Sequence, residues 1–149
     1  TKLDLSHNQL TSLPNSVGNL TALTKLDLSN HQLTSLPDSI VDLTTMTKLD
    51  LSHNQLTSLP YSIGNLDTLT TLNICNNPLT TLPESIGYLT ELTSLQLDPR
   101  HFFESTQLIG LWKQLHDEKS HKLDFLPSSI SNVIIDNKLN LSGHRLTSL

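Results

Sequence analysis

The residues best able to do chemistry in this chain are one cysteine, seven histidines and a set of acidic side chains. The tightest group is His116, Asp117, Glu118 and His121, but its spacing matches neither an HExxH motif nor a zinc-finger ligand set. We interpret this group as a solvated polar turn. The sequence also contains no glycine-rich phosphate loop and no serine nucleophile elbow. It therefore predicts no enzyme, and no catalytic, cofactor-binding or metal-binding residues.

Cys75 is explained by the copies of its surroundings elsewhere in the chain. The equivalent position holds a serine in two other copies of the same segment, at Ser29 and Ser52. We therefore interpret Cys75 as an exposed, passive thiol and not as a nucleophile. A lone thiol cannot form an internal disulfide, which favours a reducing, cytoplasmic location.

A short leucine-rich segment recurs every 23 residues along most of the chain. It reads LDLSNHQLTSLP from Leu26, LDLSHNQLTSLP from Leu49 and LNICNNPLTTLP from Leu72, and each copy continues as xSIxxLxxLT, with Met46 at the last leucine position in the first of them. A period of this length is typical of a solenoid. The Leu-x-Leu alternation predicts a short strand whose leucines point inward, so that Leu28, Leu51 and Ile74 are buried.

Stacking such units would place their strands side by side in a parallel sheet. The segment from Pro37 to Leu43 then returns along the opposite side and supplies Ile40 and Leu43 to the core. Pro37 fixes its own φ angle, which predicts a turn or short helix after it. One unit cannot hide these side chains alone, so stability belongs to the stack.

The pattern LxLxxNxLxxLPxxIGxLxxL resembles the 23-residue class of leucine-rich repeats. It is similar to the repeats of plant intracellular Ras-group-related proteins, animal Ras-scaffold proteins and the repeat arms of Roco GTPases. The resemblance implies an α/β leucine-rich-repeat solenoid, a curved right-handed coil with a parallel β-sheet on its concave face and short helices or 3-10 turns on its convex face. It also implies an asparagine ladder at Asn8, Asn54 and Asn77. His31, Arg100 and His144 depart from the ladder, and we interpret His31 as a local exchange because SNHQL replaces SHNQL.

The repeat predicts one domain, a single array of six to seven repeats over residues 1–149. The pattern loosens between residues 98 and 122, loses two residues, and then returns, with Lys138 rejoining the column of Lys25 and Lys48. Neither end carries a capping pattern. We therefore expect a fragment of a longer array.

In such a fold we expect a partner to bind the outward-facing strand positions. These positions are Lys2, Asp4, Lys25, Asp27, Lys48, Asp50, Asn73, Cys75, Gln96 and Asp98. A competing interpretation is that neighbouring Lys and Asp side chains only neutralise each other, in exposed pairs worth about 0–1 kcal/mol each.

Binding hot spots favour Trp, Tyr and Arg, and the strand columns contain none of these. Arg100, Phe103 and Trp112 in the irregular segment are therefore candidate anchors. The alternative for Trp112 is that it fills the leucine position with which it aligns.

Charge and hydropathy narrow the class of partner. The net charge is −5 and no basic cluster is present, which argues against nucleic acid. No apolar run reaches the roughly 20 residues of a membrane span. We expect a non-catalytic module that binds a protein on its concave face, and the resemblance implies kinase or small-GTPase signalling, with a Ras-like GTPase as one partner. The alternatives are the recognition arm of a larger enzyme, such as a Roco-type GTPase or kinase or a ubiquitin-ligase effector, and an extracellular recognition domain.

Overall fold

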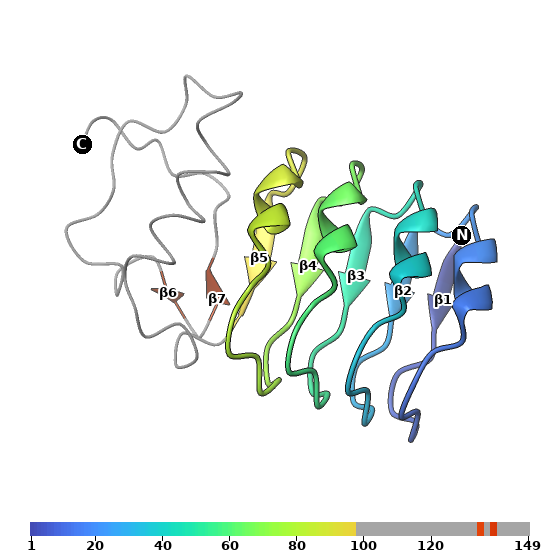
Figure 1. Ribbon diagram of the computed structural model, residues 1–149, viewed down its shortest axis with the longest axis horizontal. Helices are drawn as coiled ribbons and strands as arrows, with labels where there is room; N and C mark the ends of the chain where they lie inside the picture. Colours follow the sequence, from blue (N-terminus) through green and yellow to red (C-terminus); the bar gives the residue numbers. More distant parts are fainter. Residues whose placement is uncertain (98–133, 136–137, 140–149) are drawn as a thin grey trace.

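The computed structural model describes residues 1–97, 134–135 and 138–139. Within residues 1–97, short strands alternate with single 3-10 turns, and Figure 1 shows the strands in one row and the helical turns in a second row. The strands are β1 (Lys2–Asp4), β2 (Lys25–Asp27), β3 (Lys48–Asp50), β4 (Thr71–Asn73) and β5 (Ser94–Gln96). The turns are η1 (Asn15–Asn19), η2 (Asp38–Asp42), η3 (Tyr61–Asn65) and η4 (Glu84–Tyr88). This confirms the predicted solenoid architecture.

Strands β1 to β5 form a parallel sheet in which equivalent residues of successive repeats are direct neighbours. Lys2 pairs with Lys25, and Lys25 pairs with Lys48. In the same way Asp50 pairs with Asn73, and Asn73 with Gln96. The 23-residue period therefore becomes a set of straight columns across the sheet. Each column carries equivalent residues of successive repeats at about 4.8 Å intervals.

The prediction that Lys138 rejoins the parallel lysine column is wrong. Strand β7 (Lys138–Leu139) runs antiparallel to β5, with Leu139 opposite Leu95, and β6 (Ile134–Ile135) runs antiparallel to β7. Only two residues separate β6 from β7 in the sequence. That length suits a hairpin, whereas a parallel pair needs a full crossover connection.

The core lies between the strands and the helical turns, as the repeat pattern predicts. Leu28 and Leu51 have no exposed surface and Ile74 has 2%, so the inward side of each strand is confirmed. Ile40 and Leu43 close the core from η2 and are equally buried. Full burial of one such side chain contributes about 1.5–3 kcal/mol. Each helical turn follows a proline in extended conformation, Pro37 for η2, which confirms the predicted turn after this residue.

The asparagine ladder is present and joins successive coils through buried hydrogen bonds. The Asn54 Nδ2 donates to the Leu28 and Leu51 carbonyls at 2.8 and 2.9 Å, and its Oδ1 accepts from the Leu33 N–H at 3.0 Å. Asn77 repeats the arrangement one coil later, with Leu56 N–H as the donor at 3.0 Å. The ladder satisfies backbone groups that the short strands leave unpaired.

His31 occupies the ladder position of its repeat, and its ring reproduces the asparagine contacts. The Leu10 N–H donates to Nδ1 at 3.2 Å, so that Nε2 carries the proton and donates to the Leu5 carbonyl at 2.8 Å. Asn30 takes the preceding position, which adopts a left-handed conformation in every described repeat that has it, at His7, Asn30, His53 and Asn76. Asn and His tolerate this conformation better than most residues. The predicted local exchange is confirmed.

Replacing His31 with asparagine should raise the free energy of unfolding by about 1 kcal/mol, because an amide can also donate to carbonyls within its own coil, as Asn54 does. Urea unfolding of the full chain measures the change. His53→Asn, at an exposed position of the next repeat, is the control and should change stability much less. A destabilised His31→Asn protein would show that the imidazole fits this site better than an amide.

A second ladder, of threonines, runs along the other end of the strands and was missed in the sequence. The Thr24 Oγ1 donates to the Thr1 carbonyl at 2.9 Å, and the same bond recurs from Thr47, Thr70 and Thr93 to the preceding member. The spacing of these threonines was visible, but threonine is common throughout the repeat. Only the structure separates the bonded column from the others.

Candidate functional site on the concave face

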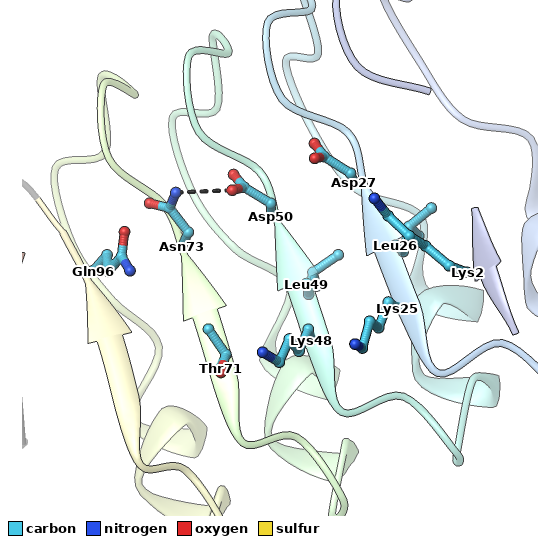
Figure 2. Close-up of a pocket in the computed structure, with 10 residues that line it drawn as sticks. All are labelled: Lys2, Lys25, Leu26, Asp27, Lys48, Leu49, Asp50, Thr71, Asn73 and Gln96. Atoms are coloured by element: carbon cyan, nitrogen blue, oxygen red, sulfur yellow. Dashed lines mark hydrogen bonds between the residues drawn. The ribbon is translucent and has the colours of Figure 1, made fainter. Parts of the chain in front are cut away.

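The outward side of the sheet forms an open groove of about 260 Å³. Its walls are the side chains that Figure 2 labels, Lys2, Lys25, Leu26, Asp27, Lys48, Leu49, Asp50, Thr71, Asn73 and Gln96. Eight of these ten side chains are polar or charged, so the groove offers hydrogen bonds and charges beside the aliphatic carbons of its walls. Most of the predicted strand-face residues are thereby brought together.

The lysine column has mostly unpaired charges. Lys2 forms an ion pair with Asp4 at 3.3 Å, and no other ion pair occurs among the residues that the structure describes. Lys25 and Lys48 are exposed and lie side by side in the groove. The interpretation that each Lys neutralises the Asp of its own strand therefore holds only for Lys2.

The aspartates are oriented by the chain that follows each strand. The Asp27 Oδ1 accepts the Ser29 N–H at 3.0 Å. Asp50 accepts both the N–H and the hydroxyl of Ser52, at 2.9 and 2.7 Å, and its second oxygen accepts from the Asn73 amide at 3.0 Å, the dashed line in Figure 2. These bonds hold the Asp27 and Asp50 carboxylates at one end of the strands, apart from the Lys25 and Lys48 ammonium groups in Figure 2. The groove thus presents a cationic row beside an anionic row.

The first aspartate of the row shows the electrostatic effect of the same contacts. The Ser6 hydroxyl donates to the Asp4 carboxylate at 2.7 Å, and Ser6 N–H donates at 3.1 Å. These bonds, together with the Lys2 ammonium, lower the pKa of Asp4 below its usual value because they favour the ionised form. The carboxylate is therefore charged at neutral pH.

The column of Ser29, Ser52 and Cys75 is less exposed than predicted. Ser29 and Ser52 are 8% and 6% exposed, so these positions do not face a partner. In β1 to β3, the Asp that ends the strand accepts a hydrogen bond from the N–H of the serine two positions later. Cys75, in the same column, is half-buried and not the freely exposed thiol that we expected.

Several predicted residues lie outside the described part of the chain. They are Asp98 and the candidate anchors Arg100, Phe103 and Trp112, together with the group around His116. Among the described residues, no cluster of three or more His, Cys, Asp or Glu side chains is arranged to hold a metal ion. Within the same residues, no helix has the length and apolar character needed to cross a bilayer.

Two exposed aromatic residues were overlooked in the sequence. Tyr61 and Tyr88 belong to η3 and η4, on the side of the solenoid opposite the groove, and are 62% and 56% exposed. Neither residue lies in a strand column or in the irregular segment, where we expected the binding residues. The sequence did mark Tyr61, because it follows Pro60 directly. The residue after the corresponding proline is Asn15, Asp38 or Glu84 in the other described repeats.

A parallel sheet with an open polar groove, backed by 3-10 turns and joined by an asparagine ladder, defines a repeat solenoid. The model of the leucine rich repeat family matches residues 1–56 and 44–101. The chain belongs to the leucine-rich-repeat family. No curated protein sequence gives a significant match.

Solved structures agree with this assignment. The crystal structure of PEPR1–AtPEP1 is 35% identical over 65% of this chain and 14% of that one, with a TM-score of 0.57. The leucine-rich-repeat protein LIC12759 of Leptospira interrogans is 31% identical over 84% of this chain and 44% of that one, with a TM-score of 0.53. The chain therefore spans less than half the length of either protein.

Proposed function

We propose that this chain is a protein-binding module whose concave groove holds an extended segment of a partner. The observation that carries the proposal is the exposed pair Lys25 and Lys48, which has no acidic partner among the described residues. Like charges in neighbouring strands repel each other, at about 4.8 Å strand spacing. Carboxylates of a bound segment would relieve that repulsion.

The rest of the groove is consistent with such a ligand. Asn73 and Gln96 continue the acidic row as uncharged amides, which offer both donors and acceptors to a peptide backbone. The similar PEPR1–AtPEP1 structure supports the proposal, since its name couples PEPR1 with a second molecule. Rim charges of this kind act mainly on association rate and specificity.

A selection experiment tests the groove directly. Peptides selected from a random library on the full chain should bind the Lys25→Glu/Lys48→Glu protein about tenfold more weakly, if each lost ion pair contributes about 0.7 kcal/mol. Thr34→Glu/Thr57→Glu is the control, because these exposed residues of the same two repeats do not line the groove. Equal binding to all three proteins would exclude the lysine pair.

We further propose a cytoplasmic signalling context, with a Ras-like small GTPase or a kinase scaffold as the partner class. The resemblance to Ras-group-related repeats is its support. The resemblance to the repeat arms of Roco GTPases supports a second candidate, the recognition arm of a larger enzyme. The complete reading frame distinguishes the two candidates. A P-loop or kinase signature in the same chain would show that the repeats belong to a larger enzyme.

A further inference from the structure

The two exposed tyrosines form one aromatic surface across neighbouring coils. The Tyr61 and Tyr88 hydroxyls lie 3.4 Å apart, within hydrogen-bond distance. Each ring comes from a different helical turn, η3 and η4, and both keep more than half of their surface in solvent. Tyrosine is enriched in protein interfaces because it offers a large, rigid contact area at low entropic cost. The pair is therefore a preformed contact surface with no partner in the described part of the chain beyond its own two members.

Charge on the same side of the solenoid has one sign. Outside the strands, all Lys, Arg, Asp and Glu side chains of residues 1–97 are acidic, and all are exposed. They are Asp38, Asp42, Asp67, Glu84 and Glu91. The three lysines of this segment all belong to strands β1 to β3. The helical side therefore favours a cationic partner and repels an acidic one.

Tyr61 stands between two of these acids in the stack. Asp38, Tyr61 and Glu84 are the first residues of η2, η3 and η4, so they occupy the same position in three successive coils. The Ser62 hydroxyl donates to the Asp38 carboxylate at 3.1 Å, which ties that acid to η3. The bond to Tyr88 and, more weakly, the charge of Glu84 raise the pKa of Tyr61. Glu84 in the following coil therefore acts electrostatically on Tyr61, and Asp38 holds the equivalent position in the preceding coil.

We propose that this helical face, centred on Tyr61 and Tyr88, is a second interaction surface that binds an arginine-containing segment of a partner protein. A guanidinium group stacks on an aromatic ring and pairs with carboxylates at the same time. Asp38 and Glu84, at the equivalent positions of the two neighbouring coils, would supply the carboxylates for such pairs. This surface is separate from the groove, and the proposal does not depend on the function proposed for the groove.

The probe is the peptide acetyl-Gly-Arg-Gly-Arg-Gly-amide, and its match is the same peptide with citrulline in place of arginine. Citrulline keeps the shape of the side chain and removes its charge. Titrated into the full chain at low salt, the arginine peptide should shift the ring signals of Tyr61 and Tyr88 saturably in NMR spectra. The citrulline peptide should not. Equal shifts with both peptides would overturn the proposal.

Variants locate the site. Tyr61→Ser should weaken binding of the arginine peptide about fivefold and Tyr61→Phe should keep it, since the ring face makes the contact. Glu84→Gln and Asp38→Asn should each cost about twofold, whereas Glu91→Gln, which removes the same charge away from Tyr61 in the stack, should cost less. An undiminished affinity in Tyr61→Ser, or equal losses in Glu84→Gln and Glu91→Gln, would show general attraction to an acidic protein. Unfolding midpoints close to that of the parent chain would confirm that these exposed changes leave the fold intact.

Discussion

Replacing Asn54 with alanine is expected to lower the free energy of unfolding by about 3 kcal/mol. The amide lies in the core, 7% exposed, and joins its own coil to the coil before it. Its loss leaves the Leu33 N–H and the Leu28 carbonyl without these bonds in a site that water does not reach. Each buried polar group left unsatisfied costs about 1–3 kcal/mol. Urea unfolding monitored by circular dichroism measures the change.

Asn8→Ala is the matched control for this prediction. Asn8 holds the equivalent position in the first repeat, where it is exposed and donates to the Leu5 and Ser6 carbonyls. Water can replace it there, so the expected loss is about 1 kcal/mol or less. If Asn8→Ala and Asn54→Ala destabilise the protein equally, the ladder does not derive its strength from burial between coils.

Replacing Gly64 with valine is expected to destabilise the protein by about 2–3 kcal/mol. A Cβ atom at this position in η3 would collide with the backbone carbonyl of Ser85 in η4, which cannot rotate away. The Ser85 hydroxyl already donates to the Tyr61 carbonyl at this junction, so the two turns are held in close contact. Forcing volume into such a contact typically costs about 1–3 kcal/mol. Thermal and urea unfolding should both report the loss.

The chain itself contains a natural comparison for Gly64. Val41 stands at the equivalent position in η2, where it is half-buried and packs against the core. At that junction the Ser62 hydroxyl bonds to the Asp38 side chain and not to a backbone carbonyl. Asn65→Val, an exposed change in the same turn, is the control and should cost much less. Similar losses in both variants would mean that valine is simply unsuited to this turn.

The two faces of the solenoid differ in how strictly their residues repeat. Along the strands, the repeat multiplies Lys25 and Asp27 into columns, so the groove is uniform over three repeats and becomes uncharged in the next two. On the helical side, Tyr61 and Tyr88 each occur at one coil only. A partner bound in the groove would contact the same residue types in successive repeats. A partner bound to the helical face would contact a single aromatic site.

The sequence by itself determined the solenoid, the buried strand leucines and most of the polar residues that line the groove. These follow from period alone, because leucines every 23 residues can leave water only when successive coils stack. The period also placed His31 at the ladder position. Asn30 directly before it showed that the histidine and asparagine of this repeat are exchanged. The repeat period determines which residues share a column. In this chain that information was sufficient to predict the fold.

Only the tertiary structure decided how the members of a column are used. It showed that Ser29 is buried while Lys25 is exposed. It also reversed β7 relative to the parallel strands, and it brought Tyr61 and Tyr88 together from positions 27 residues apart. Those outcomes depend on side-chain direction and on contacts between coils. A one-dimensional period contains neither.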